Sequence, residues 1–244
     1  RAATLRGHAD SLYAIDVSPD GQRLATGSYD QKILLWNIPS QRLERELTGH
    51  NGAINDLAFH PTGKLLASAS ADDTIKLWNV ADGVRLDTLG QPEKEQNTVV
   101  FSPDGRWVAA GGADNRLRLW ELKAMGREGG SPLVHSRFAH EAPILRAQFS
   151  RDGRLLVTSG EDRALKFWET ETFTPVKVMK DQPDWSTALA LSIDRQSLFV
   201  GRLDGSQERI DLTDIGPLSP PEIAPIVGLA VPEVSLKSPV PALV

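Results

Sequence analysis

Histidine, aspartate and a hydroxyl residue recur together three times along the chain, and nucleophilic catalysis uses these residue types. A tryptophan follows each set. The sets are His8, Thr26, Asp30 and Trp36; His50, Ser68, Asp72 and Trp78; and His140, Thr158, Asp162 and Trp168. Since an enzyme needs a catalytic triad once, the threefold recurrence favours a structural explanation.

The three sets belong to an internal repeat. Trp36, Trp78, Trp120 and Trp168 are separated by 42, 42 and 48 residues, and a further step of 42 reaches Ile210. An aspartate lies six residues before each of these five positions. Turn sequences keep the same step, with PDG at 19–21, PTG at 61–63, PDG at 103–105 and RDG at 151–153. Five units in one register predict a repeat architecture.

Each unit has the sequence pattern of short strands separated by turns. In the second unit we expect strands at 54–59, 65–70, 74–78 and 84–89, because β-branched and aromatic residues there alternate with Gly, Pro and Asp clusters. No segment has a helical period over 11 or more residues. The sequence therefore predicts an all-β fold.

The repeat resembles the WD-repeat family of β-propellers. Gly7-His8, Gly49-His50 and Ala139-His140 carry the likeness, together with the tryptophan that ends each of those units. The third unit keeps Leu119-Trp120 and has lost its Gly-His. The resemblance implies four-stranded antiparallel blades around a central channel. We predict a propeller at 1–212, with repeats at about 7–48, 49–90, 91–138, 139–180 and 181–212, and a tail at 213–244 that holds seven prolines and acts as a linker or terminus.

The same resemblance implies that each recurring set is a hydrogen-bond chain inside a blade. Aspartate accepts from histidine, histidine from the hydroxyl, and the hydroxyl from the indole N–H. The third unit has Pro92 and Ala110 at the histidine and hydroxyl positions, and the fifth has Gln182 and Val200. Because the two residues are lost together, we interpret them as members of one buried network and assign no catalytic residue.

Other chemistry has little support in the sequence. The chain has no cysteine, which excludes disulfides and thiolate sites. It has no Walker-type loop, no GxSxG elbow and no HExxH motif, so we expect no cofactor, no metal and no enzyme activity. A net charge of −5 gives no basic footprint for nucleic acid. No apolar run is long enough for a membrane helix, and the sequence does not determine the compartment.

The resemblance also marks positions for partner binding on the propeller face that holds the aspartate turns. The positions lie three and five residues after the histidine and one before the aspartate. The candidates are Ser11, Tyr13, Tyr29, Asn55, Glu95, Asn97, Leu145, Glu161, Trp185 and Leu203. Both tyrosines of the chain are in this set. Ring closure would bring them beside Trp185 and Leu203, an aromatic cluster typical of a binding hot spot.

Two alternatives describe how the ring is completed. Ala2–Leu5 can supply the missing outer strand of the fifth blade, because PLSPP at 217–221 cannot pair as a strand. Alternatively, the five units are part of a larger propeller, seven-bladed as in most proteins of this resemblance. We favour the second, because the chain starts at Arg1 rather than Met.

We therefore expect a non-catalytic scaffold that presents the aspartate-turn face to a protein or peptide. A structural module of a larger multidomain protein is the alternative. A third, weaker interpretation is a ligand-binding or hydrolase propeller that uses the central channel.

Overall fold

The computed structural model describes residues 4–90, 92–122, 130–194 and 196–215. These residues form nineteen β-strands and no helix. The all-β prediction is therefore confirmed. Most of the predicted tail, residues 216–244, lies outside the described part of the chain.

The strands group into five antiparallel sheets, which we call blades 1 to 5. Blade 1 contains β1 (Leu12–Val17), β2 (Arg23–Ser28), β3 (Ile33–Asn37) and β4 (Arg42–Leu47). Blade 2 contains β5 (Ile54–Phe59), β6 (Leu65–Ser70), β7 (Ile75–Asn79) and β8 (Arg85–Leu89). Blade 3 contains β9 (Gln96–Phe101), β10 (Trp107–Gly112), β11 (Arg116–Glu121) and β12 (Leu133–Phe138). Blade 4 contains β13 (Ile144–Phe149), β14 (Leu155–Gly160), β15 (Leu165–Glu169) and β16 (Thr174–Met179). Blade 5 contains β17 (Ser186–Leu191), β18 (Ser197–Arg202) and β19 (Gln207–Asp211).

Turn chemistry sets the strand pairing within each blade. In blade 2 the Gly63 N–H donates to the His60 carbonyl at 2.8 Å, which closes the turn between β5 and β6. Gly63 has φ +70°, a left-handed conformation that glycine adopts without strain. The same turn returns at Gly21, Gly105 and Gly153, so the first four units fold into the same meander of adjacent strands.

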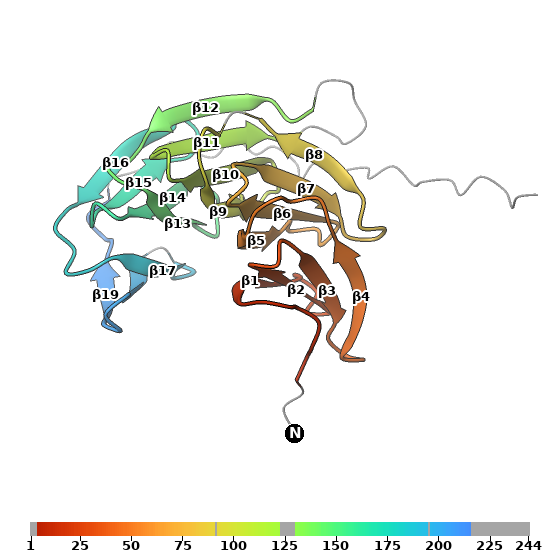
Figure 1. The fold of residues 1–244 in the computed structure, drawn as a ribbon. Helices are drawn as coiled ribbons and strands as arrows, with labels where there is room; N and C mark the ends of the chain where they lie inside the picture. Colours follow the sequence, from red (N-terminus) through yellow and green to blue (C-terminus); the bar gives the residue numbers. More distant parts are fainter. Residues whose placement is uncertain (1–3, 91, 123–129, 195, 216–244) are drawn as a thin grey trace, which may run out of the picture.

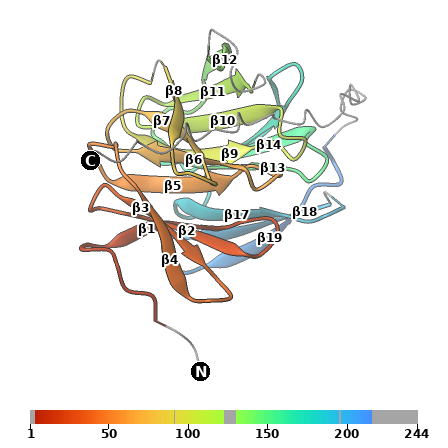
Figure 2. The ribbon, with the colours of Figure 1, turned by 90° about the vertical axis from the view of Figure 1, so that its right-hand side faces the viewer.

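The blades follow one another around an arc whose inner strands are β1, β5, β9, β13 and β17 (Figure 1). Each inner strand packs beside the next, whereas β17 and β1 have no comparable packing in the described chain. Strands β17 and β1 overlap in Figure 2 but lie at opposite ends of the arc in Figure 1. The propeller prediction is confirmed, and the arc is open between blades 5 and 1.

The fifth blade differs from the expected pattern of four strands. Its sheet has the order β17-β18-β19, with no described strand beyond β19. Of the segment expected to supply that strand, residues 2 and 3 lie outside the described chain, and Thr4 and Leu5 belong to no strand. The described residues therefore do not show the proposed closure.

The hydrophobic core lies between blades rather than within them. Blades 1 and 2 enclose one apolar cluster, which includes Ala25 and Leu35 from blade 1 and Leu57, Phe59 and Leu66 from blade 2. Three further clusters lie between the later pairs of blades. Because each strand alternates its side chains, one face of a blade meets the preceding blade and the other meets the following one.

Candidate functional site

The recurring set of aspartate, histidine, hydroxyl and tryptophan side chains forms a continuous hydrogen-bond chain in blade 2. His50 Nδ1 lies 2.8 Å from Asp72 Oδ2, and His50 Nε2 lies 2.7 Å from Ser68 Oγ. The Trp78 indole N–H donates to Ser68 Oγ at 2.9 Å. With the proton on Nδ1, the ring donates to the carboxylate and accepts from the hydroxyl, which satisfies all four side chains.

Blade 1 repeats the chain with nearly the same distances. His8 lies 2.9 Å from Asp30 and 2.8 Å from Thr26, and the Trp36 indole donates to Thr26 at 2.9 Å. Blade 4 does the same: His140 lies 2.9 Å from both Asp162 and Thr158, and Trp168 donates to Thr158 at 2.9 Å.

Each aspartate also fixes the chain that enters its blade. Asp72 accepts the Asn51 backbone N–H at 2.9 Å and the Thr74 N–H at 3.1 Å. Asp30 and Asp162 accept the equivalent backbone groups of Ala9 and Glu141. The hydrogen-bond chain thus ties the turn between the second and third strands to the loop that precedes the first strand.

Electrostatics support a structural role for these residues. Burial lowers the pKa of His50 to about 4, so the ring is neutral at pH 7. Burial opposes ionisation of Asp72, but hydrogen bonds from Thr74, Asn51 and His50 outweigh it and lower the pKa of Asp72 to about 2. The Ser68 hydroxyl is fully buried. A hydroxyl without access to solvent cannot attack an external substrate, so the geometry of this set does not suit nucleophilic catalysis.

Blades 3 and 5 replace the histidine chain with different polar networks, which the sequence analysis missed. In blade 3 the Arg118 guanidinium forms a buried ion pair with Asp114 at 2.6 Å. In blade 5 Arg202 donates to Gln182 Oε1 at 2.9 Å and forms an ion pair with Glu208. In blade 3 the available signal was Arg118 together with the loss of the histidine, since blades 2 and 4 also have a cation at this position, Lys76 and Lys166.

The predicted aromatic cluster divides into two groups at the ends of the arc. Tyr13 and Tyr29 are exposed on blade 1 and form an edge-to-face pair with ring centroids 6.1 Å apart. Trp185 and Leu203 are exposed on blade 5, where the Leu203 N–H donates to the Trp185 carbonyl at 3.0 Å. The sequence pattern predicts one joint cluster. Because the arc is open, the structure holds two separate patches on the same rim.

The remaining candidates have different surroundings. Ser11 and Glu95 are exposed, whereas Leu145 and Glu161 are half-buried. Two others serve contacts between blades: the Asn55 side-chain amide donates to the Gln96 carbonyl at 3.0 Å, and that of Asn97 donates to the Ile144 carbonyl at 2.9 Å. The side chains of these two asparagines therefore join neighbouring blades.

The inner strands line an open central pocket of about 520 Å³. Asp56 lines it and accepts hydrogen bonds from the Thr98 hydroxyl at 2.9 Å and the Val99 N–H at 3.0 Å, both from the next blade. Burial raises the pKa of Asp56, and the nearby Arg146 opposes that shift. Asp16 accepts the Phe59 N–H at 2.6 Å in the same way. These carboxylates link blades.

Two further features of the described residues bear on other functions. Within residues 4–90, 92–122, 130–194 and 196–215, no three His, Asp or Glu side chains lie together as metal ligands. The same part of the chain contains no helix of the length and hydropathy needed to cross a bilayer.

Comparison with known proteins agrees with the architecture. The curated protein "Eukaryotic translation initiation factor 3 subunit I" from Aspergillus niger is 47% identical over 38 residues, which cover 16% of this chain and 11% of that protein. The match thus spans a small part of either protein. A family model described as the IFT122 first beta-propeller matches residues 1–212. Five WD-type units in an all-β arc, together with a family match over most of the chain, show that the chain belongs to the family of the IFT122 first beta-propeller, a WD-repeat β-propeller.

Proposed function

We propose that the chain is a non-catalytic scaffold that binds a protein or peptide at the rim holding the aspartate turns. The observation that carries this proposal is the exposed Tyr13–Tyr29 pair, since paired aromatic rings left in solvent are typical anchors of protein interfaces. The printed name of the curated relative describes that protein as a subunit of a larger factor, which supports a protein as the class of partner.

The histidine chains contribute to this function indirectly. They fix the turns and loops from which the rim residues project. In blade 1 Asp30 binds His8 and the backbone of Ala9 and Lys32, and Tyr29 comes directly before Asp30. A rim held in this way presents its aromatic side chains without a large entropy loss on binding.

Site-specific photo-crosslinking tests the proposal in cells of the source organism. p-Benzoylphenylalanine replaces Tyr29 in one variant and Ile38 in a control variant. Ile38 is also exposed but lies in the turn between β3 and β4, on the opposite rim. We expect a discrete crosslinked protein from position 29 and none from position 38.

A second variant tests whether the aromatic pair is the anchor. Tyr13→Ala in the position-29 probe should reduce the crosslinked product by at least about tenfold if the pair contributes the roughly 1.4 kcal/mol or more expected of a binding hot spot. Equal crosslinking from both rims, or a product unaffected by Tyr13→Ala, would contradict binding at this surface.

A further inference from the structure

The interface between blades 3 and 4 departs from the repeat pattern on the rim opposite the tyrosines. In every blade the backbone N–H two residues after the tryptophan position donates to the carbonyl of the residue before the second strand. This bond runs from Val80 to Lys64 in blade 2 and from Thr170 to Arg154 in blade 4, at 3.0 Å in both. The five donors are Ile38, Val80, Leu122, Thr170 and Leu212. Thr170 is therefore a hydroxyl residue at a position that is aliphatic in the other four blades.

Packing of the blades gives no use for this hydroxyl. Val80, Leu122 and Leu212 are each 3% exposed and belong to the apolar clusters between blades. Thr170 is 6% exposed, and its Oγ has no hydrogen-bond partner in the described part of the chain. An unpaired buried hydroxyl destabilises the folded state, so an aliphatic residue would suit the blade better. Such a departure from the pattern is expected where a residue serves a ligand.

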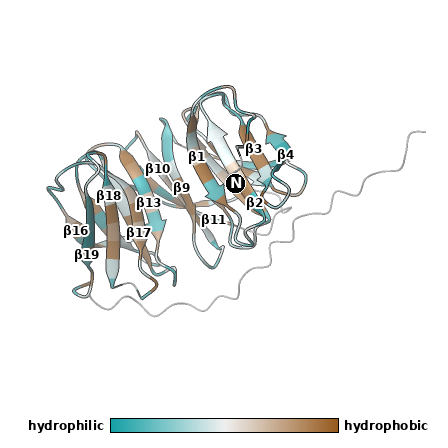
Figure 3. Ribbon diagram, turned by 90° about the horizontal axis from the view of Figure 1, so that it is seen from below, coloured by the Kyte–Doolittle hydropathy of each residue, from teal (hydrophilic) through white to brown (hydrophobic). Residues whose placement is uncertain are grey.

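Thr170 lines a pocket of about 260 Å³ between the two blades. Trp107 and His135 line it from blade 3, and Glu169 and Glu171 line it from blade 4, on either side of the threonine. Strand β13 of blade 4 lies beside β9 and β10 of blade 3, so the pocket belongs to a packed interface in the middle of the arc (Figure 3). Sites for small organic ligands usually have roughly 300–1,000 Å³. A pocket of this smaller size suits a single side chain.

Stacked rings hold one wall of the pocket in place. The His135 ring stacks on Phe173 with centroids 5.0 Å apart, and Phe173 stacks on Trp168 at 5.9 Å. Phe173 is fully buried and has φ +52°, a left-handed conformation that a bulky residue keeps only where its packing holds it. Blades 1 and 2 have Gln41 and Gly83 at this position. A pocket with such a fixed wall loses little entropy when it is filled.

The charged groups of the pocket favour a cation. Burial, and the nearby Arg137, lower the pKa of His135, so this ring adds no positive charge at pH 7. Four carboxylates and two guanidinium groups line the pocket and give it a net charge of −2: Asp104, Asp152, Glu169, Glu171, Arg106 and Arg154.

Two of these groups show which charge is available to a ligand. The Arg106 guanidinium lies 3.2 Å from Glu121 and 4.7 Å from the centroid of the Trp107 ring, so its charge is engaged within blade 3. Glu171 is exposed and forms no ion pair with another described residue. The Glu171 carboxylate, next to Thr170 in the sequence, can therefore take up a new cation.

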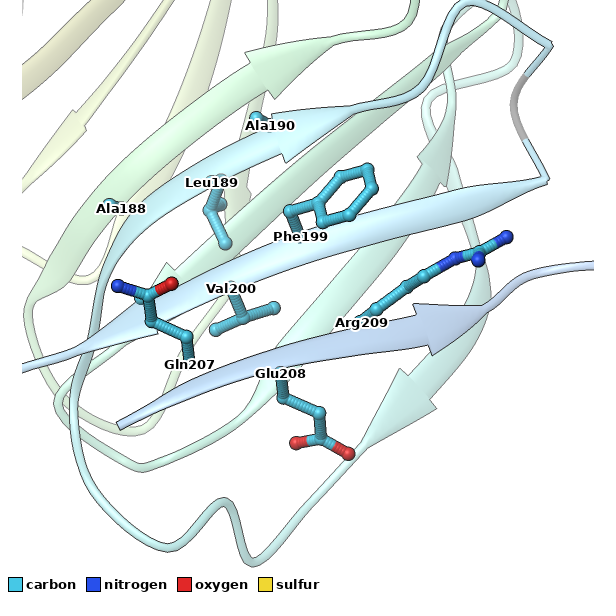
Figure 4. A pocket seen from close by; sticks show the side chains of 9 residues that line it. Ala188, Leu189, Ala190, Phe199, Val200, Gln207, Glu208 and Arg209 are labelled. Atoms are coloured by element: carbon cyan, nitrogen blue, oxygen red, sulfur yellow. The ribbon is translucent and has the colours of Figure 1, made fainter. Parts of the chain in front are cut away.

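A larger pocket, of about 440 Å³, has no such features. It lies on one face of blade 5, where Leu189, Phe199 and Arg209 line it (Figure 4). The corresponding faces of other blades, as at Ala25 and Ala67, pack against the following blade. The larger pocket is thus a blade face of the kind that packs between blades.

We propose that the pocket between blades 3 and 4 binds a lysine or arginine side chain of a partner protein. The cationic head lies among the carboxylates, where Glu171 supplies charge and the Thr170 hydroxyl accepts a hydrogen bond, and the aliphatic stem lies along Trp107. Val134 lines the same pocket, is 42% exposed, and offers an apolar contact to a residue beside the basic one. A pocket for one side chain with an apolar neighbour favours an anchor residue of a peptide over a free amine. Because the pocket and the tyrosines lie on opposite rims, this inference does not depend on the surface proposed above.

Fluorine NMR of the full 244-residue chain, labelled with 5-fluorotryptophan, tests the inference. The chain has six tryptophans, and the variant Trp107→Phe identifies the Trp107 signal by its loss. The probes are acetylated, amidated peptides in which lysine, arginine or norleucine stands between alanines, together with 1,5-diaminopentane as the free amine. We expect a basic peptide to shift the Trp107 signal in a saturable way and to leave the signal of Trp185, on the opposite rim, unchanged. It should bind at least tenfold more tightly than the norleucine peptide.

Three results would overturn the inference. Neither basic peptide shifts the Trp107 signal at millimolar concentration, so the pocket takes no basic side chain. The norleucine peptide binds as tightly as the basic ones, so charge plays no part. The diamine binds as tightly as the peptides, so the site takes a free amine rather than a protein.

The variant Thr170→Val tests the role of the hydroxyl. It gives blade 4 the residue type that blade 2 has at this position, Val80, so the fold accepts it. We expect the affinity for the tighter of the two basic peptides to fall at least about threefold. The urea midpoint should stay the same or rise, because the unpaired buried hydroxyl is gone. An unchanged affinity would contradict the inference.

The variant Glu171→Gln tests the charge, and Glu141→Gln is its matched control. Glu141 is also exposed and belongs to the loop before β13, on the rim with the tyrosines. We expect Glu171→Gln to weaken binding of the basic peptide at least about threefold and Glu141→Gln to change it less than about twofold. Equal effects would show that the peptide responds to the net charge of the chain, which would contradict binding at this pocket. Crosslinking from position 29 reports on the other rim, so each proposal can fail without the other.

Discussion

Blades 2 and 3 are neighbours with the same four-stranded sheet, yet they hold the aspartate turn in different ways. Blade 2 uses His50 between Asp72 and Ser68. Blade 3 has neither the histidine nor the hydroxyl, and Arg118 pairs directly with Asp114. A buried aspartate at this turn can therefore be held by an arginine as well as by a histidine chain.

The two solutions differ in their electrostatics. In blade 2 the Asp72 carboxylate accepts hydrogen bonds from several neutral donors, and the Lys76 ammonium lies farther away, at 3.8 Å. The blade 3 pair contains two buried charges of opposite sign, each of which depends on the other. Removal of one member should therefore cost more in blade 3 than in blade 2.

The largest effect should come from Asp114→Asn. This change leaves the Arg118 guanidinium buried without its counter-charge, and loss of one partner of a buried pair costs about 3–5 kcal/mol. We expect the free energy of unfolding, measured with urea, to fall by that amount. Asp73→Asn is the control: Asp73 is exposed, its left-handed φ of 65° suits asparagine, and the change should stay within about 0.5 kcal/mol. Equal effects of the two changes would show that the ion pair contributes nothing.

Acid should weaken the histidine chain of blade 2 by a route that the Arg118–Asp114 pair of blade 3 does not have. The folded pKa of His50, about 4, lies below its value of 6.5 in an unfolded chain, so the unfolded state binds more protons between these values. Stability therefore falls as pH falls from 6.5 to 4, by an amount on the order of 3 kcal/mol. Below that range the stability due to Asp72 is lost as pH falls from 3.8 toward 2.

The variant His50→Gln gives blade 2 the residue type that blade 5 has at this position, Gln182. It should reduce the fall in stability between pH 6.5 and pH 4. His60 and His135 also have pKa values lowered by burial, so part of the slope remains. Urea midpoints measured at intervals from pH 4 to 7 give the comparison. A variant with the full slope of the original chain would show that His50 is not the titrating group.

His50→Ala should have a smaller effect than Asp114→Asn but a clear one. It removes one donor to the Asp72 carboxylate and the ring nitrogen that accepts from the Ser68 hydroxyl, at a cost of about 1–3 kcal/mol. Gln182→Ala in blade 5 should cost less, because Arg202 keeps its ion pair with Glu208. Thermal unfolding of both variants measures which of the two loses more stability. A larger loss from Gln182→Ala would reverse the ranking of the two networks.

The local pattern of each unit was predictable from sequence. The strands at 54–59 and 65–70 lie where the turn residues place them, because those turns act within a few residues. The contacts between units were not predictable. Asn55 occupies a rim position in the sequence pattern, but its amide reaches the Gln96 carbonyl, 41 positions along the chain. The spacing of residues also could not show that Leu12 and Ile15 are uncovered, because they follow the same pattern as their buried counterparts in blade 2.

The smallest effect on stability should come from the rim of blade 1, in contrast to the network directly beneath it. Tyr13 and Tyr29 are both exposed, so the double change Tyr13→Ala/Tyr29→Ala loses one aromatic contact, worth about 0.5–1.5 kcal/mol at most, and buries no unpaired group. We expect the urea midpoint to stay close to that of the original chain. His8→Ala in the same blade removes one donor to Asp30 and the ring nitrogen that accepts from the Thr26 hydroxyl, and it should lower the midpoint further. If the tyrosines instead cost as much as His8, they stabilise the blade edge, and a role in partner binding would no longer be needed to explain them.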